Sequence, residues 1–288
     1  MRTVIKDHSV ISFFILTFVI SWMCWLPLVF FSDSLKMSNI FVSLLVGVVG
    51  AGGPSLAAII LTYLQNGREG VLNLLKRLVL WRVNAKWYLV VLFLLPALMV
   101  LAILLNAVLG GKIGSMPFFG QWYWPIILPL GFLLAIIMGG PLEEEMGWRG
   151  YALPRLQSTL NPLYASIIIG IIWGAWHLPL FLIPGTSQYS LSMAFFLPFA
   201  VLLMADSIIM TWVYNNTKGS ILMAILSHAT KNIGYALLPL MTVLPGDIRA
   251  AAIYMALVWI ISIAVIAMNW KVFVTSHPML IRNENVAI

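Results

Sequence analysis

The most restrictive feature of this sequence is a series of apolar segments, each close to the length that crosses a lipid bilayer. A helix needs about 20 apolar residues to span about 30 Å of hydrocarbon. Segments of this kind are expected to form membrane-spanning helices at residues 9–31, 40–64, 87–109, 124–140, 163–183, 193–214, 219–240 and 250–270. Hydrophobic residues make up 62% of the chain and charged residues only 9%, whereas a soluble domain carries about a quarter charged residues. The predicted fold is therefore all-α, a polytopic membrane protein with about eight transmembrane helices.

The apolar segments account for nearly the whole chain. The first one follows Arg2 and Lys6, is too long for a signal-peptide core and lacks a small-residue cleavage site, so we expect an uncleaved span. The second contains several glycines followed by Pro54, which predict close helix contacts and a kink. The lone Cys24 excludes an intramolecular disulfide. With no internal repeat or soluble segment, residues 1–288 are predicted to form a single integral-membrane domain.

Basic residues are distributed unequally between the two predicted faces of the membrane. One face carries Arg2, Lys6, Arg68, Lys76, Arg77, Arg82, Lys86, Arg149, Arg155, Lys218, Lys271 and Arg282. The other face carries only Lys36, Lys112 and Arg249. Because basic loops stay on the cytoplasmic side, both termini are predicted to be cytoplasmic in a multi-pass plasma-membrane protein. The net charge of +7 is thus expected to orient the chain in the membrane, and no nucleic-acid partner is predicted.

The connection at residues 65–86 combines five of these basic residues with apolar residues at helical spacing. This pattern predicts an amphipathic helix lying on the membrane surface. The alternative is a cytosolic loop helix that contacts nothing.

A cluster of charge interrupts the apolar pattern at residues 140–150. Three of the chain's 9 acidic residues, Glu143, Glu144 and Glu145, are adjacent here. A charge in or beside hydrocarbon costs at least about 2.5 kcal/mol, so such a cluster indicates a functional site. In a helix Glu145 and Arg149 share a face and are predicted to pair, which leaves Glu144 available to hold a water. Glu143 is expected to lie nearest to solvent. The alternative is that the glutamates merely end a helix at the cytoplasmic surface, where they would oppose the helix dipole.

Two histidines inside other apolar segments are the remaining candidates for chemistry. His177 lies in the middle of the fifth predicted span, and alone it could equally form a helix–helix hydrogen bond. His228 and Asn232 in the seventh span are four residues apart, so both can address one ligand. We expect these segments to meet the glutamates in one polar, water-holding site inside the bundle. Lys231 and Asp206 are the unassigned membrane charges and are predicted to pair.

Three spaced motifs occur in order along the chain: Glu144-Glu145-x-x-x-Arg149, Trp173-x-x-x-His177 and His228-x-x-x-Asn232. They resemble the EExxxR, FxxxH and HxxxN motifs of the CAAX-protease and bacteriocin-processing (CPBP, or Abi) family of intramembrane proteases. The motif core covers about residues 141–232. Trp173 replaces the family's phenylalanine, which should matter little because both are aromatic. The extra Glu143 means that only the spacing to Arg149 selects the paired glutamates.

The resemblance implies an intramembrane endopeptidase that hydrolyses a peptide bond within or beside the membrane. Eukaryotic members remove the last three residues from prenylated proteins, and many bacterial members are linked to bacteriocin maturation or self-immunity. Carried over to this chain, Glu144 assisted by His177 would activate water, and His228 with Asn232 would face the oxyanion. Arg149, fixed by Glu145, would hold the first motif in register. The expected partners are the lipid bilayer and a membrane-associated peptide or protein substrate, prenylated or bacteriocin-like.

The sequence does not determine whether the site binds a metal ion. Glu144, His177 and His228 match the ligand set of many catalytic zinc sites, which keep a fourth position for water. The HExxH arrangement is lacking, however, and the same residues suffice for a metal-free mechanism. We favour Glu144 as the base, with one divalent metal, zinc above others, as an accessory.

Two other classes of function compete with a protease. One is a non-catalytic bacteriocin self-immunity or peptide-binding membrane protein, and the other is a proton-coupled transporter. The complete set of site residues favours an enzyme, and a transporter would more often show an internal repeat.

Overall fold

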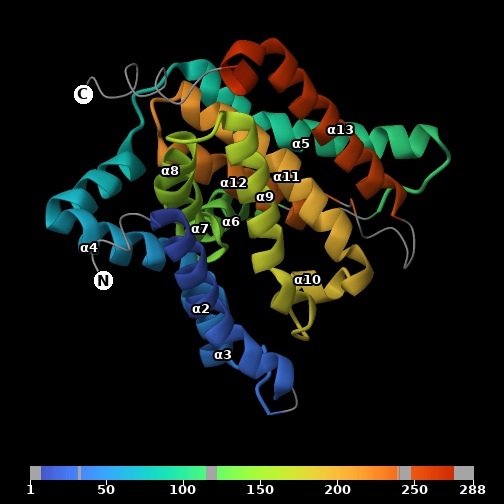
Figure 1. Cartoon of the computed structure of the whole chain (residues 1–288). Coiled ribbons are helices and arrows are strands. Elements are labelled where there is room, and N and C mark those ends of the chain that lie inside the picture. The colour runs from blue at the N-terminus through green and yellow to red at the C-terminus, as the bar shows by residue number, and fades with distance from the viewer. Residues whose placement is uncertain (1–7, 32–33, 115–121, 239, 241–247, 276–288) are drawn as a thin grey trace.

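The computed structural model describes residues 8–31, 34–114, 122–238, 240 and 248–275, and within these ranges every regular element is helical (Figure 1). The longer helices are α2 (Ser9–Phe30), α4 (Gly53–Lys76), α5 (Ala85–Val108), α6 (Trp124–Met138), α9 (Pro162–Trp176), α11 (Phe196–Asn216), α12 (Ile221–Leu237) and α13 (Arg249–Met268). Shorter helical segments are α3 (Ile40–Leu44), η1 (Leu45–Gly50), η2 (Arg77–Val79), α7 (Pro141–Gly147), η3 (Trp148–Ala152), α8 (Leu153–Gln157), η4 (Leu178–Phe181), α10 (Ser187–Ser190), η5 (Met193–Phe195) and η6 (Lys271–Thr275). The all-α, polytopic prediction is confirmed.

The number of spans is smaller than the sequence pattern suggested. In the described part of the chain four helices are long and apolar enough to cross a membrane: Ser9–Phe30, Ala85–Val108, Met193–Asn216 and Arg249–Met268. Two bent helix pairs raise the number to six if each counts as one span. The predicted count of eight is not confirmed. The reason is length, because α9 has 15 residues and α12 has 17, short of the ~20 that a bilayer requires.

Both bent pairs break at glycines. The pair Ile40–Gly50 and Gly53–Val79 bends by 47°, with Pro54 in the first turn of α4, so the kink predicted there is confirmed. A side chain at Gly53 would overlap Ser21 of α2, which explains why the close helix contact requires glycine. The pair Trp124–Met138 and Pro141–Gln157 bends by 43°. This second break is the one that starts the charged segment.

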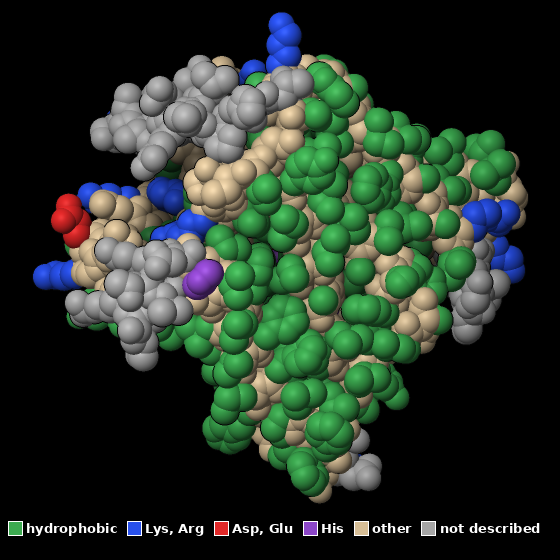
Figure 2. All heavy atoms as spheres, in the orientation of Figure 1, with side chains coloured by type: hydrophobic (Ala, Val, Ile, Leu, Met, Phe, Trp, Pro, Cys, Tyr) green, Lys and Arg blue, Asp and Glu red, His purple; other side chains and the backbone are tan. Residues whose placement is uncertain are grey.

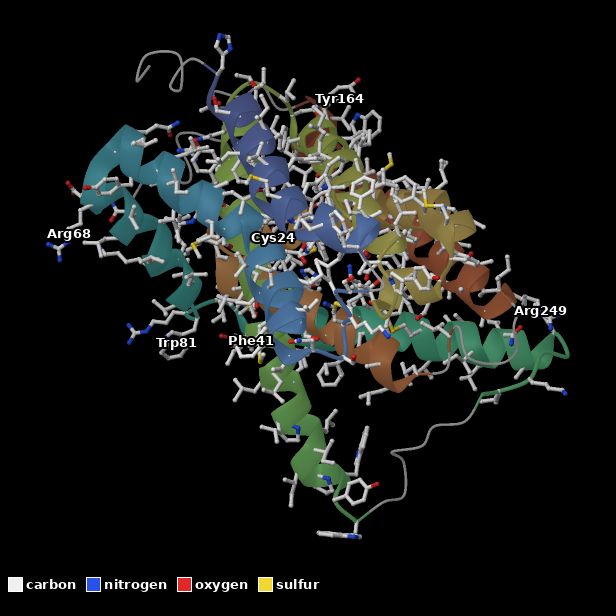
Figure 3. All side chains as sticks on the ribbon, turned by 90° about the horizontal axis from the view of Figure 1, so that it is seen from below. Cys24, Phe41, Arg68, Trp81, Tyr164 and Arg249 are labelled. Atoms are coloured by element: carbon white, nitrogen blue, oxygen red, sulfur yellow. The ribbon has the colours of Figure 1, made fainter. Side chains whose placement is uncertain are left out.

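The charged segment α7 occupies the middle of the bundle, with α4 on one side and α5 and α13 on the other (Figure 1). It packs against α4, α6 and α12. α9 lies along α11, where Gly170 and Gly174 face Met204 and Ala200 with no room for larger side chains. α6 has no buried residue and projects away from the other helices (Figure 3). The site is therefore surrounded by short and broken helices, which the longer spans enclose.

The surface is consistent with a lipid environment. Hydrophobic side chains cover the middle of the face in Figure 2, and the visible Lys and Arg side chains lie toward its edges. Arg68 and Trp81 lie at one end of the molecule and Arg249 at the opposite end (Figure 3). This separation follows the division of basic residues between two faces. Arg2, Lys6 and Arg282 lie outside the described residues.

The predicted surface helix at 65–86 is in part a continuation of α4. Gly67, with φ of 65°, kinks α4 before its last turns. Beyond the kink Leu74 is buried, whereas Leu72 and Val79 are 45% and 69% exposed. The segment is thus helical, with one side against the bundle and apolar side chains on its outer side.

Candidate active site

The three adjacent glutamates form the first turns of α7, and all three are buried. Their exposed fractions are 8% for Glu143, 4% for Glu144 and 0% for Glu145. The alternative that the glutamates end a helix at the surface is therefore wrong. Glu143 is the most exposed of the three, as expected, although it too is buried. The chain breaks at Gly139 and Gly140 and restarts as α7, so the carboxylates lie at a helix N-terminus, where the dipole favours negative charge.

Glu145 is the centre of a fully buried charge network. Arg149 Nη1 donates to Glu145 Oε2 at 3.0 Å and to Oε1 at 3.3 Å, so the predicted pair is confirmed. His228 Nδ1 lies 2.8 Å from the Oε1 atom of Glu145. Because a carboxylate only accepts, His228 donates at Nδ1, and its Nε2 atom remains available. The first and third motifs therefore meet through Glu145.

Glu144 is held by a residue that the sequence analysis did not treat as functional. The indole nitrogen of Trp173 donates to Glu144 Oε2 at 2.5 Å. A phenylalanine has no such donor, so the expectation that tryptophan at this position should matter little overlooked the N–H group. The other oxygen, Oε1, lies over Gly140, where a Cβ atom would overlap it. The sequence did contain a signal for this contact, because tryptophan in place of the family's phenylalanine adds an N–H donor.

His177 lies at the end of α9 and not in the middle of a span. The helix stops at Trp176 and continues as the turn η4, which contains Pro179, a residue that cannot donate a backbone hydrogen bond. His177 Nδ1 lies 2.8 Å from the carbonyl oxygen of Trp173. The ring therefore donates at Nδ1, as His228 does, and its Nε2 atom remains an acceptor. His177 is only 7% exposed, within the same buried region.

Asn232 lies beside the break that precedes α7. Its side-chain nitrogen donates to the carbonyl oxygen of Gly139 at 3.0 Å. His228, one turn earlier on α12, reaches Glu145, so the two side chains share a face of α12 as predicted. Asn232 is partly exposed and makes no hydrogen bond to Glu144 or His177 in the described structure, so its oxyanion role stays a prediction.

Trp173 connects the site with a second buried ion pair. Lys231 Nζ donates to Asp206 Oδ2 at 3.0 Å, which confirms the predicted pair between α12 and α11. The Lys231 ammonium also lies 4.8 Å from the centre of the Trp173 ring, and the Arg149 guanidinium lies 4.7 Å from it. Cations at this distance are attracted by the ring's quadrupole. Trp173, which belongs to the second motif, thus contacts the segments of the first and third motifs.

The donor chemistry of the site suits a metal, but the described side chains do not gather into a metal site. Each histidine donates at Nδ1 and keeps Nε2 free, which is the usual state of a metal-bound histidine. However, no group of three His, Cys, Asp or Glu side chains in the described part of the chain is close enough to hold an ion. Glu144, His177 and His228 are therefore not assembled as a ligand set in the described structure.

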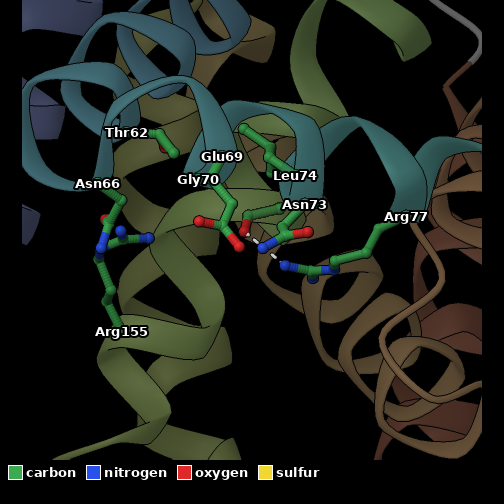
Figure 4. Close-up of a pocket in the computed structure, with 9 residues that line it drawn as sticks. Thr62, Asn66, Glu69, Gly70, Asn73, Leu74, Arg77 and Arg155 are labelled. Atoms are coloured by element: carbon green, nitrogen blue, oxygen red, sulfur yellow. Dashed lines mark hydrogen bonds between the residues drawn. The ribbon is translucent and has the colours of Figure 1, made fainter. Parts of the chain in front are cut away.

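A pocket of about 400 Å³ lies apart from these residues, between α4 and the segment that follows Arg149 (Figure 4). Arg77 and Arg155 lie on either side of Glu69 in it. Arg77 donates to the carbonyl oxygens of Gly150 and Gly219 and to Tyr214, and Arg155 donates to Tyr151 and Gln65. These bonds tie α4 and η2 to the motif segment and to the start of α12, so both guanidinium groups already have a structural role.

Comparisons with known proteins indicate one family. Residues 125–234 match the model of the family described as type II CAAX prenyl endopeptidase Rce1-like. The chain is also 33% identical over 231 residues to CAAX prenyl protease 2 of Methanococcus maripaludis. That similarity covers 78% of this chain and 83% of the relative. The matched segment contains every residue of the buried site.

Proposed function

The chain belongs to the CAAX prenyl endopeptidase family, an intramembrane hydrolase family, and from this premise we propose that Glu144 is the general base of peptide-bond hydrolysis. The observation that carries the proposal is that three helices meet at two adjacent buried carboxylates. Glu144 is held by α9 through Trp173, and the adjacent Glu145 is held by α12 through His228. A base buried among fixed dipoles and charges is the arrangement that water activation requires.

The proposed reaction uses only side chains of this chain and one water molecule. Glu144 takes a proton from the water while the water oxygen attacks the carbonyl carbon of the peptide bond. His177, whose Nε2 atom accepts hydrogen bonds, helps to orient that water. The C–N bond then breaks, and the leaving amine takes up the proton that Glu144 received. Electrons from the C–N bond leave with the amine, and the new carboxyl group gives its remaining proton to that amine, so the products are a carboxylate and an ammonium group.

His228 is assigned to the oxyanion that forms at the carbonyl oxygen. For this role the ring must take up a proton at Nε2, so that both nitrogens carry N–H groups, and Glu145 at Nδ1 supports the resulting positive charge. The Nε2–H group is then free to donate to the oxyanion. Arg149 fixes Glu145 and thereby His228. Asn232 is proposed as a second donor through the amide hydrogen that Gly139 does not use.

The substrate is proposed to be a membrane-associated peptide or protein with a prenylated carboxyl-terminal CAAX sequence. This assignment rests on the family, which is that of the CAAX prenyl endopeptidases. We also propose a plasma-membrane location with both termini in the cytoplasm, because basic residues prevail on that side of the sequence-derived topology. A bacteriocin-like substrate is the alternative that the same chemistry would serve.

Glu144→Gln tests the proposal directly. Glutamine keeps the shape and can still accept from Trp173, but it cannot take up a proton. Cleavage of a fluorogenic, farnesylated CAAX peptide by purified protein in lipid nanodiscs should fall by about 10²-fold or more. The matched control is Glu69→Gln, which removes an exposed carboxylate outside the site and should leave the rate unchanged. Full activity of Glu144→Gln would reject Glu144 as the base. Wild-type protein that cleaves neither this peptide nor its unprenylated form would reject the proposed substrate.

A further inference from the structure

The side chain of Trp173 contacts residues from several helical segments of the site. It lies in α9, is 1% exposed, and its ring is within 4.7–4.8 Å of the cations of both Arg149 and Lys231. Its backbone carbonyl accepts from the ring of His177, and its ring meets the ring of His228 edge-on at 5.3 Å. The residue thus touches α7, η3 and α12, in addition to its own helix.

The hydrogen bond from Trp173 fixes the orientation of the Glu144 carboxylate. A glutamate side chain can rotate about its last torsion with little restriction, because that torsion has a broad energy profile. The indole N–H holds Oε2 at 2.5 Å, while Oε1 lies over Gly140. Both carboxylate oxygens are therefore fixed in position, and the carboxylate presents one orientation to a water molecule.

We propose that Trp173 is a positioning residue, whose indole N–H holds the Glu144 carboxylate in the orientation that water activation requires. The inference rests on the proposed function, since it gives the N–H group a task only if Glu144 is the base. The aromatic ring and the N–H group have separable tasks. The ring fills the space between Arg149 and Lys231, which phenylalanine can also do, whereas only the N–H group reaches Glu144.

Trp173→Phe separates the two tasks. The variant keeps an aromatic ring between the two cations and removes the donor to Glu144. A hydrogen bond to a charged group is worth roughly a tenfold change in rate or more. We expect kcat to fall about tenfold with KM unchanged within twofold, and with a thermal unfolding midpoint close to that of wild type. A structural role alone would lower the unfolding midpoint without this selective loss of kcat.

Trp148→Phe is the matched control. Trp148 is fully buried in the same region, and its indole nitrogen has no hydrogen-bond acceptor among the residues that the structure describes. This variant removes the same atoms but no hydrogen bond, so kcat should stay within twofold of wild type. An equal loss of kcat in both variants would overturn the inference, because it would reflect general loss of aromatic packing.

Two further measurements keep the test decisive. If Trp173→Phe does not yield folded protein, benzothienylalanine at position 173 keeps the two-ring shape and replaces the N–H group by sulfur; the same tenfold loss is expected. A kcat within twofold of wild type for the donor-free variant overturns the positioning role.

Glu144→Gln measured in the same assay distinguishes the two proposals. If that variant is inactive while Trp173→Phe is fully active, only the positioning role fails; if Glu144→Gln is active, the proposed function fails.

Discussion

Lys231 Nζ and Asp206 Oδ2 form a 3.0 Å ion pair that joins α12 to α11 inside the bundle. Both side chains are almost fully buried, and Asp206 Oδ1 has no hydrogen-bond partner among the described residues. The ammonium group also faces the Trp173 ring. The pair therefore connects α12, which carries His228, to α11, which packs along α9.

Removing one partner of this pair should cost much more than removing both. Asp206→Asn leaves an uncompensated buried ammonium, which should lower the free energy of unfolding by about 3 kcal/mol or more. Asp206→Asn combined with Lys231→Met should recover part of that loss, with a coupling of about 0.5–3 kcal/mol. Denaturation of the four proteins in detergent measures both quantities. Strictly additive effects would show that the two charges do not stabilise each other.

Gly140→Ala should impair catalysis by displacing the Glu144 carboxylate. The added Cβ would overlap Glu144 Oε1, and Gly140 has a φ of 100°, where side chains are strained. We expect kcat to fall by at least about tenfold, because a misplaced base loses much of its effect. The steady-state rate on the farnesylated peptide measures it.

The control for Gly140→Ala is Gly110→Ala. Gly110 also has a positive φ, 80°, but a Cβ there meets no atom within 4 Å. This variant carries similar backbone strain, of order 1 kcal/mol, without touching the site. It should lower the unfolding midpoint and keep kcat. Equal activity of the two variants would mean that the space over Gly140 has no catalytic importance.

Chelation separates the metal-free scheme from a zinc enzyme. The metal-free scheme predicts that purified protein contains much less than one zinc per chain and keeps its activity in a strong chelator. Elemental analysis and cleavage assays before and after chelation measure this. Stoichiometric zinc that is lost together with activity and restored by re-addition would instead make His177 and His228 ligands through their free Nε2 atoms.

Cysteine labelling tests the orientation in the membrane. In a Cys24→Ala background, Lys76→Cys and Lys271→Cys should react with a membrane-impermeant maleimide only after the cells are permeabilised. Lys112→Cys is the matched control on the opposite face and should react in intact cells. All three positions are exposed, so access to the thiol does not limit the reaction. Labelling of position 76 or 271 in intact cells would invert the proposed topology.

The sequence alone determined the fold class, the motif residues and one contact of the site. Long apolar segments with few charges indicate a helical membrane protein. Inside a bilayer there is no water to bond with the backbone, and a helix satisfies its own N–H and C=O groups. The pair of Glu145 and Arg149 was also predictable, since residues four apart in a helix are neighbours whatever the rest of the chain does. Asp206 and Lys231 could be paired because a buried charge requires a partner.

Only the tertiary structure decided how the motifs meet. Hydropathy counts apolar residues but does not distinguish a helix that crosses the bilayer from a shorter one that other helices enclose, and so α9 and α12 were predicted to be spans. The burial of Glu143 and the break at Gly140 depend on how α6, α7 and α12 pack, which periodicity does not contain. The contact between Trp173 and Glu144 joins residues 29 positions apart on different helices, and its short distance follows from the packing of those helices alone.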